Sequence, residues 1–231
     1  YTLGSAAPFT ALDSTICMGA SISAGHGAQQ VFDMAPSKGK RVVSVIGDST
    51  FFHTGINSLM EVFYNNSRTV NVILDNRTTG MTGHQENPGT GYHIDKSNAN
   101  AIDIEALVRA LGAKHVYTIN PNNLQEVSKT LDICLSLNEP SVIITRWPCA
   151  IKKLSPNDKG EFKNVFKSKY MVTDDCIGCE TCLICGCPAL SMNKKQARAS
   201  ISYEQCAGCG VCEQTCPAEA IVCVKGGENN G

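Results

Sequence analysis

Short apolar runs rich in β-branched residues alternate with longer amphipathic segments over the first two thirds of the chain. The short runs predict strands at residues 41–46, 70–74, 114–119 and 141–145. The amphipathic segments predict helices at residues 18–34, 54–64, 104–111 and 123–137. Continuous apolar strands separated by helices are typical of a parallel sheet covered on both faces. We therefore predict an α/β fold with a doubly wound, mostly parallel sheet.

Polar, glycine-rich segments follow the first two predicted strands. Gly47-Asp48-Ser49 comes directly after the first, and residues 75–91 come after the second. In parallel sheets the carboxyl ends of the strands meet at one edge, where ligands bind. The side-chain oxygens of Asp48 and Asn76 are ligands that Mg²⁺ prefers beside phosphate oxygens, and glycine lets the backbone approach a diphosphate. The alternative for the tripeptide alone is an ordinary turn in which Asp48 caps the following helix.

The cysteines divide the chain. Ten of the 13 lie between Cys176 and Cys223, at spacings that differ from those of a secreted disulfide scaffold and indicate thiolate metal ligands in a reducing compartment. We predict one domain over residues 1–150, a linker over 151–171 with a turn near residues 155–160, and a small α+β domain over 172–231.

The cysteine array is duplicated. Cys176, Cys179 and Cys182 recur thirty residues later, and a Cys-Pro pair closes each run; the counterparts are Cys206, Cys209 and Cys212, with Cys187-Pro188 and Cys216-Pro217. Three cysteines at two-residue spacing followed by Cys-Pro indicate iron–sulfur clusters, whereas a zinc site uses two pairs. Cys185 is the odd thiol and is the alternative to Cys187 as a ligand.

This array resembles the bacterial two-cluster ferredoxins, in which the fourth cysteine of each run ligates the other cluster. The resemblance implies one [4Fe–4S] cluster on Cys176, Cys179, Cys182 and Cys216, and a second on Cys187, Cys206, Cys209 and Cys212.

Charge and hydropathy exclude other classes of protein. Lys and Arg total 20 against 21 Asp and Glu, and this balance argues against a nucleic-acid or membrane-surface binder. Neither a run of about 18 apolar residues nor a signal peptide is visible, so we expect a cytoplasmic protein. Because the chain begins with Tyr1, we expect a fragment or a processed chain.

The first polar loop and the Asp75-Asn76 pair, with 25 residues (50–74) between Ser49 and Asp75, are similar to the thiamine diphosphate-binding motif, which usually reads GDG and ends in NN. With residues 17–21, 52–55 and 79–85, they make essentially the whole chain resemble the 2-oxoacid:ferredoxin oxidoreductases, and among them the indolepyruvate ferredoxin oxidoreductase alpha subunits. The resemblance implies a thiamine diphosphate-binding fold, with Mg²⁺ held by Asp48, Asn76 and the Thr78 carbonyl. It also implies cofactor contacts from Gly19, Ala20, Ser21, Gly47, Ser49, Gly80 and Met81.

The same resemblance implies a reaction. An aryl 2-oxoacid such as indolepyruvate loses CO₂, single electrons leave through the clusters to an external ferredoxin, and coenzyme A takes the acyl group. A second (beta) subunit is expected in a hetero-oligomer. The alternatives are a pyruvate-type or branched-chain 2-oxoacid oxidoreductase, or a pure electron-transfer protein on a non-catalytic carrier domain. Neither Glu61 nor Glu86 suits the glutamate that activates the cofactor, so we expect the carboxyl-terminal part of the subunit, unable to complete a thiamine site alone.

The remaining candidates are single histidines and cysteines. His53 and His84 follow the two loops closely and are candidate catalytic residues that orient the substrate carboxylate or move a proton. His26 reads as a hydrogen-bonded helix residue, and His93 and His115 have no supporting context. We predict that Cys134, Cys149 and Cys223 are buried small hydrophobes, and Cys17 lies beside the proposed cofactor segment.

Overall fold

The computed structural model describes residues 2–34, 39–163 and 165–225, which fall into two compact units. The sheet unit is Ile16–Glu161, and the cysteine unit combines residues of the ranges 1–15 and 162–231. These bounds differ from those expected from the sequence. The expected linker carries helix α7 (Pro156–Glu161) and most of strand β5 (Ser168–Val172), and α1 (Thr2–Ser5) groups with the cysteine unit.

The sheet unit is built on four parallel strands in the order β1-β2-β4-β3. The strands are β1 (Val43–Gly47), β2 (Val70–Asp75), β3 (His115–Ile119) and β4 (Ser141–Arg146). Each predicted strand is present, and every pairing is parallel, with Val70 of β2 opposite both Val43 and Ser141. The doubly wound parallel sheet is confirmed.

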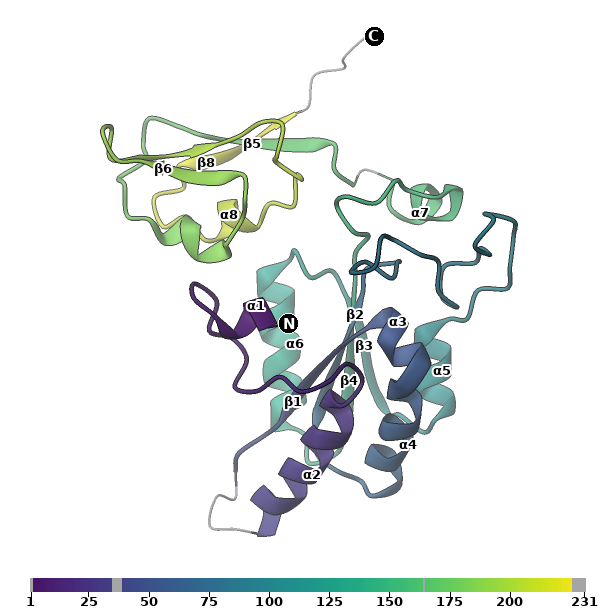
Figure 1. Cartoon of the computed structure of the whole chain (residues 1–231). Coiled ribbons are helices and arrows are strands. Elements are labelled where there is room, and N and C mark those ends of the chain that lie inside the picture. The colour runs from purple at the N-terminus through teal and green to yellow at the C-terminus, as the bar shows by residue number, and fades with distance from the viewer. Residues whose placement is uncertain (1, 35–38, 164, 226–231) are drawn as a thin grey trace. The chain divides into compact units, whose positions relative to one another are not determined.

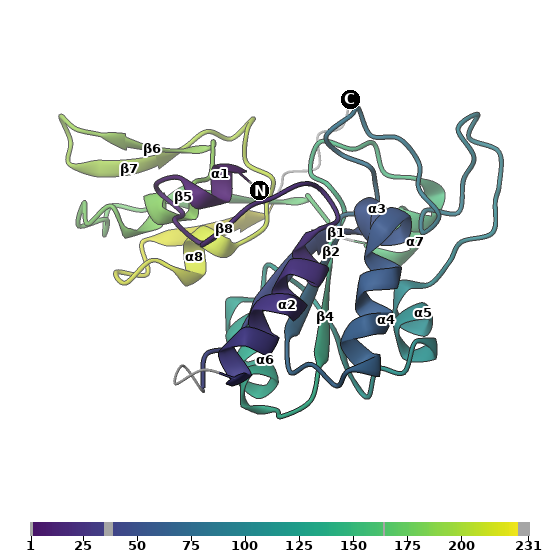
Figure 2. The same ribbon diagram turned by 60° about the horizontal axis from the view of Figure 1, so that its bottom comes forward.

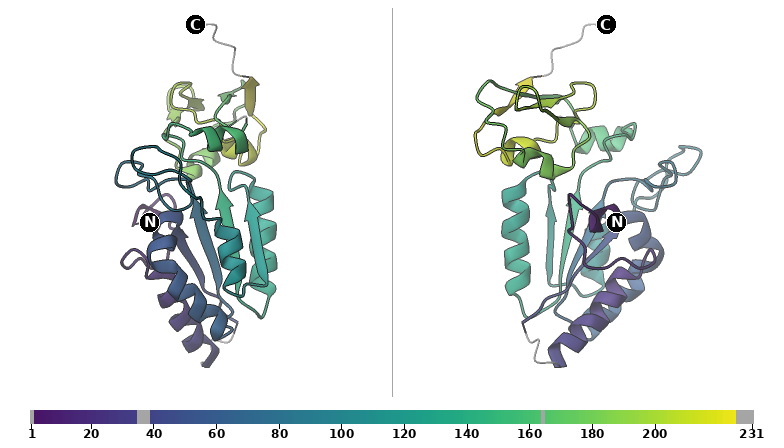
Figure 3. Two further views of the ribbon diagram at one scale, coloured as in Figure 1. Left: turned by 90° about the vertical axis from the view of Figure 1, so that its right-hand side faces the viewer. Right: turned by 60° about the vertical axis from the view of Figure 1, so that its left-hand side comes forward.

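Helices cover both faces of the sheet, as Figure 1 and the right-hand view of Figure 3 show. On one face lie α2 (Ser21–Met34), α4 (Ile56–Tyr64) and α5 (Ile104–Ala110), whose buried side chains Ile22, Leu59 and Val108 join one core cluster. Figure 2 shows α2 and α4 next to each other. On the other face, α6 (Leu124–Ser136) packs Cys134 against Val70 and Ile143. Burial of these apolar positions is the main force that stabilises the unit.

The helix after β1 starts earlier than the sequence pattern predicts. It begins at Asp48 as α3 (Asp48–Thr50), continues through a π-helical turn at Phe51–Gly55 and runs into α4, whereas the expected start was near Thr54. Gly55 allows this close packing, because a Cβ there would lie 2.8 Å from the Phe51 ring. Turns of this kind are frequent at functional sites.

The cysteine unit contains two antiparallel ribbons and two short helices. Strand β5 pairs with β8 (Ile221–Lys225), and β6 (Leu190–Asn193) pairs with β7 (Arg198–Ile201). A 3₁₀ helix, η2 (Thr181–Cys185), contains Cys182 of the first cysteine run, and α8 (Val211–Gln214) contains Cys212 of the second. The small α+β domain is confirmed. Among the described residues, no helix is long and apolar enough to cross a membrane.

Three predictions about single residues need correction. Cys134 is buried as expected, but Cys223 is exposed and Cys149 is only half-buried. Cys223 lies on the two-stranded β5–β8 ribbon, which has too little structure above it to cover both faces. His26 lies in α2 as expected, but its buried Nδ1 has no hydrogen-bond partner among the described residues.

Candidate functional site

The carboxyl edge of the sheet brings the predicted magnesium ligands together. Asp48 follows β1, and Asn76 and Thr78 follow β2, the neighbouring strand. The backbone N–H of Thr78 donates to Asn76 Oδ1 at 3.2 Å and also to the Asp48 carboxylate. The three residues expected to hold the cation therefore form one local cluster.

Two further contacts connect the loops at this edge. Asn87 donates from Nδ2 to Asp48 Oδ2 at 3.1 Å, although 39 residues separate them. Thr79 donates from its hydroxyl to Ser49 Oγ at 2.9 Å, which joins the loop after β2 to the loop after β1. Sequence reasoning missed Asn87, because no local pattern marks a residue that acts across such a separation.

The carboxylate of Asp48 is buried. Its residue is 3% exposed, and among the described residues none of its contacts is an ion pair. Burial, and secondly the charge of Asp75, raise the pKa of Asp48 to about 6. A group in this position costs free energy when ionised. A bound divalent cation would remove that cost, so the residues fit Mg²⁺.

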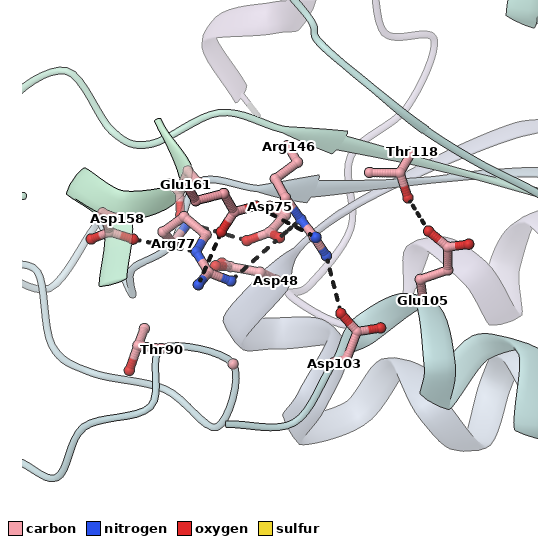
Figure 4. A network of polar contacts seen from close by, with 12 residues as sticks. Asp48, Asp75, Arg77, Thr90, Asp103, Glu105, Thr118, Arg146, Asp158 and Glu161 are labelled. Carbon is pink, nitrogen blue, oxygen red and sulfur yellow. Dashed lines mark hydrogen bonds and ion pairs between the residues drawn. The ribbon is translucent and has the colours of Figure 1, made fainter. Parts of the chain in front are cut away.

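An ion network surrounds Asp48 (Figure 4). Arg146 at the end of β4 bonds Asp75 Oδ2 at 2.8 Å, and Arg77 lies 3.4 Å from Asp158 Oδ1 and 3.7 Å from Glu161 Oε2. Burial lowers the pKa of the Arg146 guanidinium, but the charge of Asp75 and its hydrogen bond outweigh burial, so the pKa is raised. The cations of the network are thus engaged by other acids, and none of them forms an ion pair with Asp48.

The predicted cofactor segment lies against the helix that starts at Asp48. Gly19 has a φ of +90°, and a Cβ there would lie 2.0 Å from Thr54 Oγ1, so only glycine permits this approach. Ala20 and Ser21 follow directly, with Ser21 opening α2. On the second loop, a Cβ at Gly80 would lie 3.4 Å from Asn76 Nδ2, and Met81 is 82% exposed. The predicted cofactor residues thus lie near the predicted magnesium ligands in two places: Gly19 packs against the helix that starts at Asp48, and Gly80 lies beside Asn76.

The two candidate histidines differ in environment. His53 is exposed on the π-helical turn, directly before Thr54. His84 is half-buried, has a φ of +66°, and lies with Nε2 3.6 Å from Cys149 Sγ. Cys149 also donates its backbone N–H to the Asn76 carbonyl at 3.0 Å. Cys149 therefore contacts the start and the middle of the second loop, which its prediction as a buried hydrophobe did not anticipate.

A hollow lies next to Asn87 on the same long loop. It is lined by Gln85, Glu86, Asn87, Pro88, Gly91, Tyr92, His93, Ile94, Ala99 and Asn100. Glu86 is bonded to Lys96 at 2.6 Å. His93, for which the sequence offered no context, is thus part of a lined hollow beside the predicted magnesium site.

In the cysteine unit, four thiols line one pocket. They are Cys176, Cys179, Cys182 and Cys216, the set expected for the first cluster. The pKa of the Cys212 thiol is raised to about 12, first by burial and then by the neighbouring thiols of Cys209, Cys185 and Cys187. Cys185 also contacts the Thr215 hydroxyl at 3.5 Å. Both alternatives for the fourth ligand therefore lie near Cys212.

Glycines give the two cysteine runs the same backbone. Gly178 and Gly208 have φ values of +69° and +70°, and a Cβ at either would lie 2.2 Å from a carbonyl oxygen, of Ala197 and Ser168 respectively. A left-handed residue next to a right-handed one turns successive N–H groups to one side, as anion-binding concavities require. Together with the thiol-lined pocket, this backbone fits an anionic iron–sulfur cluster.

A parallel sheet whose carboxyl edge carries a buried carboxylate with no ion pair among the described residues, followed by a duplicated cysteine module, agrees with a thiamine diphosphate-binding domain joined to an iron–sulfur domain. Comparison with family models agrees: residues 2–145 match the thiamine pyrophosphate enzyme, C-terminal TPP binding domain, and residues 199–222 match the 4Fe-4S binding domain. The chain belongs to the thiamine pyrophosphate enzyme family through its C-terminal TPP binding domain.

Curated relatives are similar over nearly the whole chain. The indolepyruvate oxidoreductase subunit IorA of Archaeoglobus fulgidus is 40% identical over 222 residues, which are 96% of this chain and 34% of the relative. The subunit of the same name from Thermococcus kodakarensis is 36% identical over 237 residues, 99% of this chain and 36% of the relative. The chain spans about a third of the length of these relatives.

A solved structure shares the fold. The 2-oxoglutarate:ferredoxin oxidoreductase from Magnetococcus marinus, with 2-oxoglutarate, coenzyme A and succinyl-CoA bound, superposes with a TM-score of 0.51 at 14% identity. The match covers 62% of this chain and 50% of that one. At this identity the likeness supports the fold.

Proposed function

We propose that this chain is the cofactor-diphosphate and cluster-bearing part of a thiamine diphosphate-dependent 2-oxoacid oxidoreductase that acts on an aryl 2-oxoacid of the indolepyruvate type. One observation supports the proposal above all. The same chain carries Asp48, buried at the sheet edge with no ion pair among the described residues, and two cysteine runs at cluster spacing. The names of the relatives, which cover almost the whole chain at 36–40% identity, favour indolepyruvate as the substrate.

In this proposal Asp48, Asn76 and the Thr78 carbonyl hold Mg²⁺, and the cation binds the diphosphate. Gly47, Ser49, Gly80 and Met81 would contact the diphosphate, and Gly19, Ala20 and Ser21 would lie near the diphosphate or a ring of the cofactor. Thiamine diphosphate, when bound, supplies the carbanion stabilisation that decarboxylation needs. His53 and His84 orient the substrate carboxylate or carry a proton at their ring nitrogens.

The cysteine unit removes the electrons. Clusters accept single electrons, so oxidation proceeds in one-electron steps when an iron–sulfur domain receives them. We propose two [4Fe–4S] clusters with the ligand sets given above, an external ferredoxin as the acceptor, coenzyme A as the acyl acceptor, and a second subunit as partner.

The test is Mg²⁺-dependent binding of thiamine diphosphate to the complete enzyme, measured by calorimetry. We expect Asp48→Ala to weaken binding by more than about 100-fold, since even partners that merely orient a metal ligand cost 10–100-fold. Asp132→Ala, at an exposed position on α6, is the matched control and should bind as the wild type does.

Two outcomes contradict the proposal. Wild-type affinity in the Asp48→Ala enzyme would remove Asp48 from the site. A wild-type enzyme that binds no thiamine diphosphate with Mg²⁺ would leave an electron-transfer protein on a carrier domain. Comparison of kcat/KM for indolepyruvate and pyruvate separates the aryl substrate from its alternatives.

A further inference from the structure

The two cysteine runs end in equivalent short helices. Glu180, with φ 61° and ψ 0°, precedes η2, and Gly210, with φ 77° and ψ 3°, precedes α8. Thr181 and Val211 are the first residues of these helices, thirty positions apart like the cysteines around them. The side chains of Thr181 and Val211 therefore occupy matching places, one beside each proposed cluster.

The two positions differ in a single functional group. The Thr181 hydroxyl donates to Cys179 Sγ at 3.4 Å. Val211 carries a methyl group in place of that hydroxyl, so it cannot donate to Cys209, the counterpart of Cys179. Threonine and valine have nearly the same shape, so the duplication itself provides an isosteric comparison.

A second hydrogen bond ends on the same proposed cluster. Ala220 donates its backbone N–H to Cys216 Sγ at 3.3 Å. Cys179 and Cys216 both line the first thiol pocket. Hydrogen bonds to the sulfurs are one of the factors that set the reduction potential of a cluster. Reduction adds negative charge, so a donor at a thiolate stabilises the reduced form more than the oxidised form and raises the potential.

We propose that Thr181 is a potential-setting residue: its hydroxyl raises the reduction potential of the cluster on Cys176, Cys179, Cys182 and Cys216, a contribution that Val211 does not make to the other cluster. This inference rests on the proposed cluster binding. The two clusters are then inequivalent steps on the electron path. Lys169, which donates to the Cys206 carbonyl at 2.5 Å, places a cation near the second cluster. The test therefore measures the shift in each variant, not the order of the two potentials.

The experiment is an EPR-monitored redox titration of the anaerobic complete enzyme, with iron and acid-labile sulfide measured on each sample. Thr181→Val should lower the potential of one cluster and leave the other unchanged. The expected size is up to about a tenfold change in the ratio of reduced to oxidised cluster at fixed potential, which is 59 mV for one electron.

The reciprocal variant, Val211→Thr, should raise the potential of the other cluster, and Thr181→Ser should keep the wild-type value because it keeps the hydroxyl. Val211→Thr also provides the answer if Thr181→Val loses its cluster. Full iron content with unchanged potentials in both Thr181→Val and Val211→Thr would overturn the inference and leave the proposed function intact. A wild-type enzyme without iron and sulfide would overturn both.

Discussion

Asp48 places an ionised group in a buried site, so its replacement should stabilise the chain that lacks cation and cofactor. The fold raises the pKa of this carboxyl from 3.8 to about 6. About two pH units at 1.36 kcal/mol each make the cost about 3 kcal/mol once the group is ionised. Asp48→Asn removes that charge. It also sets one amide against that of Asn87, which costs about 1 kcal/mol, so the expected net gain is about 2 kcal/mol.

The gain depends on pH with a definite sign. A carboxyl whose pKa is raised by folding contributes its full stability below the unfolded pKa of 3.8 and loses it as pH rises through about 6. The wild type therefore falls behind the variant as pH increases. The difference should be about 2 kcal/mol at pH 8 and less than about 1 kcal/mol at pH 5.

Urea unfolding followed by fluorescence gives the measurement, because Trp147 is the single tryptophan and lies in the sheet unit. The exposed Asp132→Asn substitution on α6 should change stability by less than about 0.5 kcal/mol. With Mg²⁺ and thiamine diphosphate added to the complete enzyme, the wild type should gain stability and the Asp48→Asn variant should not. If Asp48→Asn is less stable than the wild type at pH 8, or if the difference in stability does not change with pH, the buried charge of Asp48 does not destabilise the fold.

Three further substitutions test the network and the clusters. Arg146→Met removes the 2.8 Å partner of the buried Asp75 and leaves it, among the described residues, only the 3.9 Å ion pair with Arg77, so it should cost about 2 kcal/mol in the same urea experiment. The control is the ion pair of Arg109 with Glu105 on the helix surface, where Arg109→Met should lower the free energy of unfolding by less than about 1 kcal/mol. Equal losses in the two variants would show that burial does not strengthen the Arg146–Asp75 pair. Gly208→Ala places a Cβ 2.2 Å from the Ser168 carbonyl and should reduce the iron content by about half, because one of the two proposed clusters is lost. Gly160→Ala is the control: its Cβ meets no atom within 4 Å, so the iron content should not change. Full iron content in Gly208→Ala would show that the turn tolerates a side chain. Cys187→Ser should lose one EPR signal and Cys185→Ser should lose none, and the reverse result would assign Cys185 as the ligand.

The sheet could be predicted because its strands are buried on both faces and read as continuous apolar runs. Each of the four strands starts and ends within two residues of its expected bounds. The helix after β1 was the exception. Gly-Asp-Ser favours a turn by local propensity, but packing of Phe51 and Leu59 into one core extends the helix back to Asp48.

The candidate magnesium ligands could be predicted because each of them lies directly after a strand of the sheet. Asp48, Asn76 and Thr78 follow adjacent strands, so strand order alone brings them together. Asn87 and the His84–Cys149 contact depend on the path of a long loop, which no periodicity encodes. The prediction that Cys223 is buried failed because the period of a strand does not show that a two-stranded ribbon leaves one face open.

The proposed function requires that electrons from a 2-oxoacid at the thiamine site reach the clusters of the same chain. The most direct measurement is EPR of the anaerobic complete enzyme, frozen after addition of an aryl 2-oxoacid with Mg²⁺ and thiamine diphosphate but without ferredoxin. If electrons follow this path, the wild type shows the signal of reduced [4Fe–4S] clusters, and Asp48→Ala does not. Clusters that dithionite reduces but the 2-oxoacid does not would contradict it.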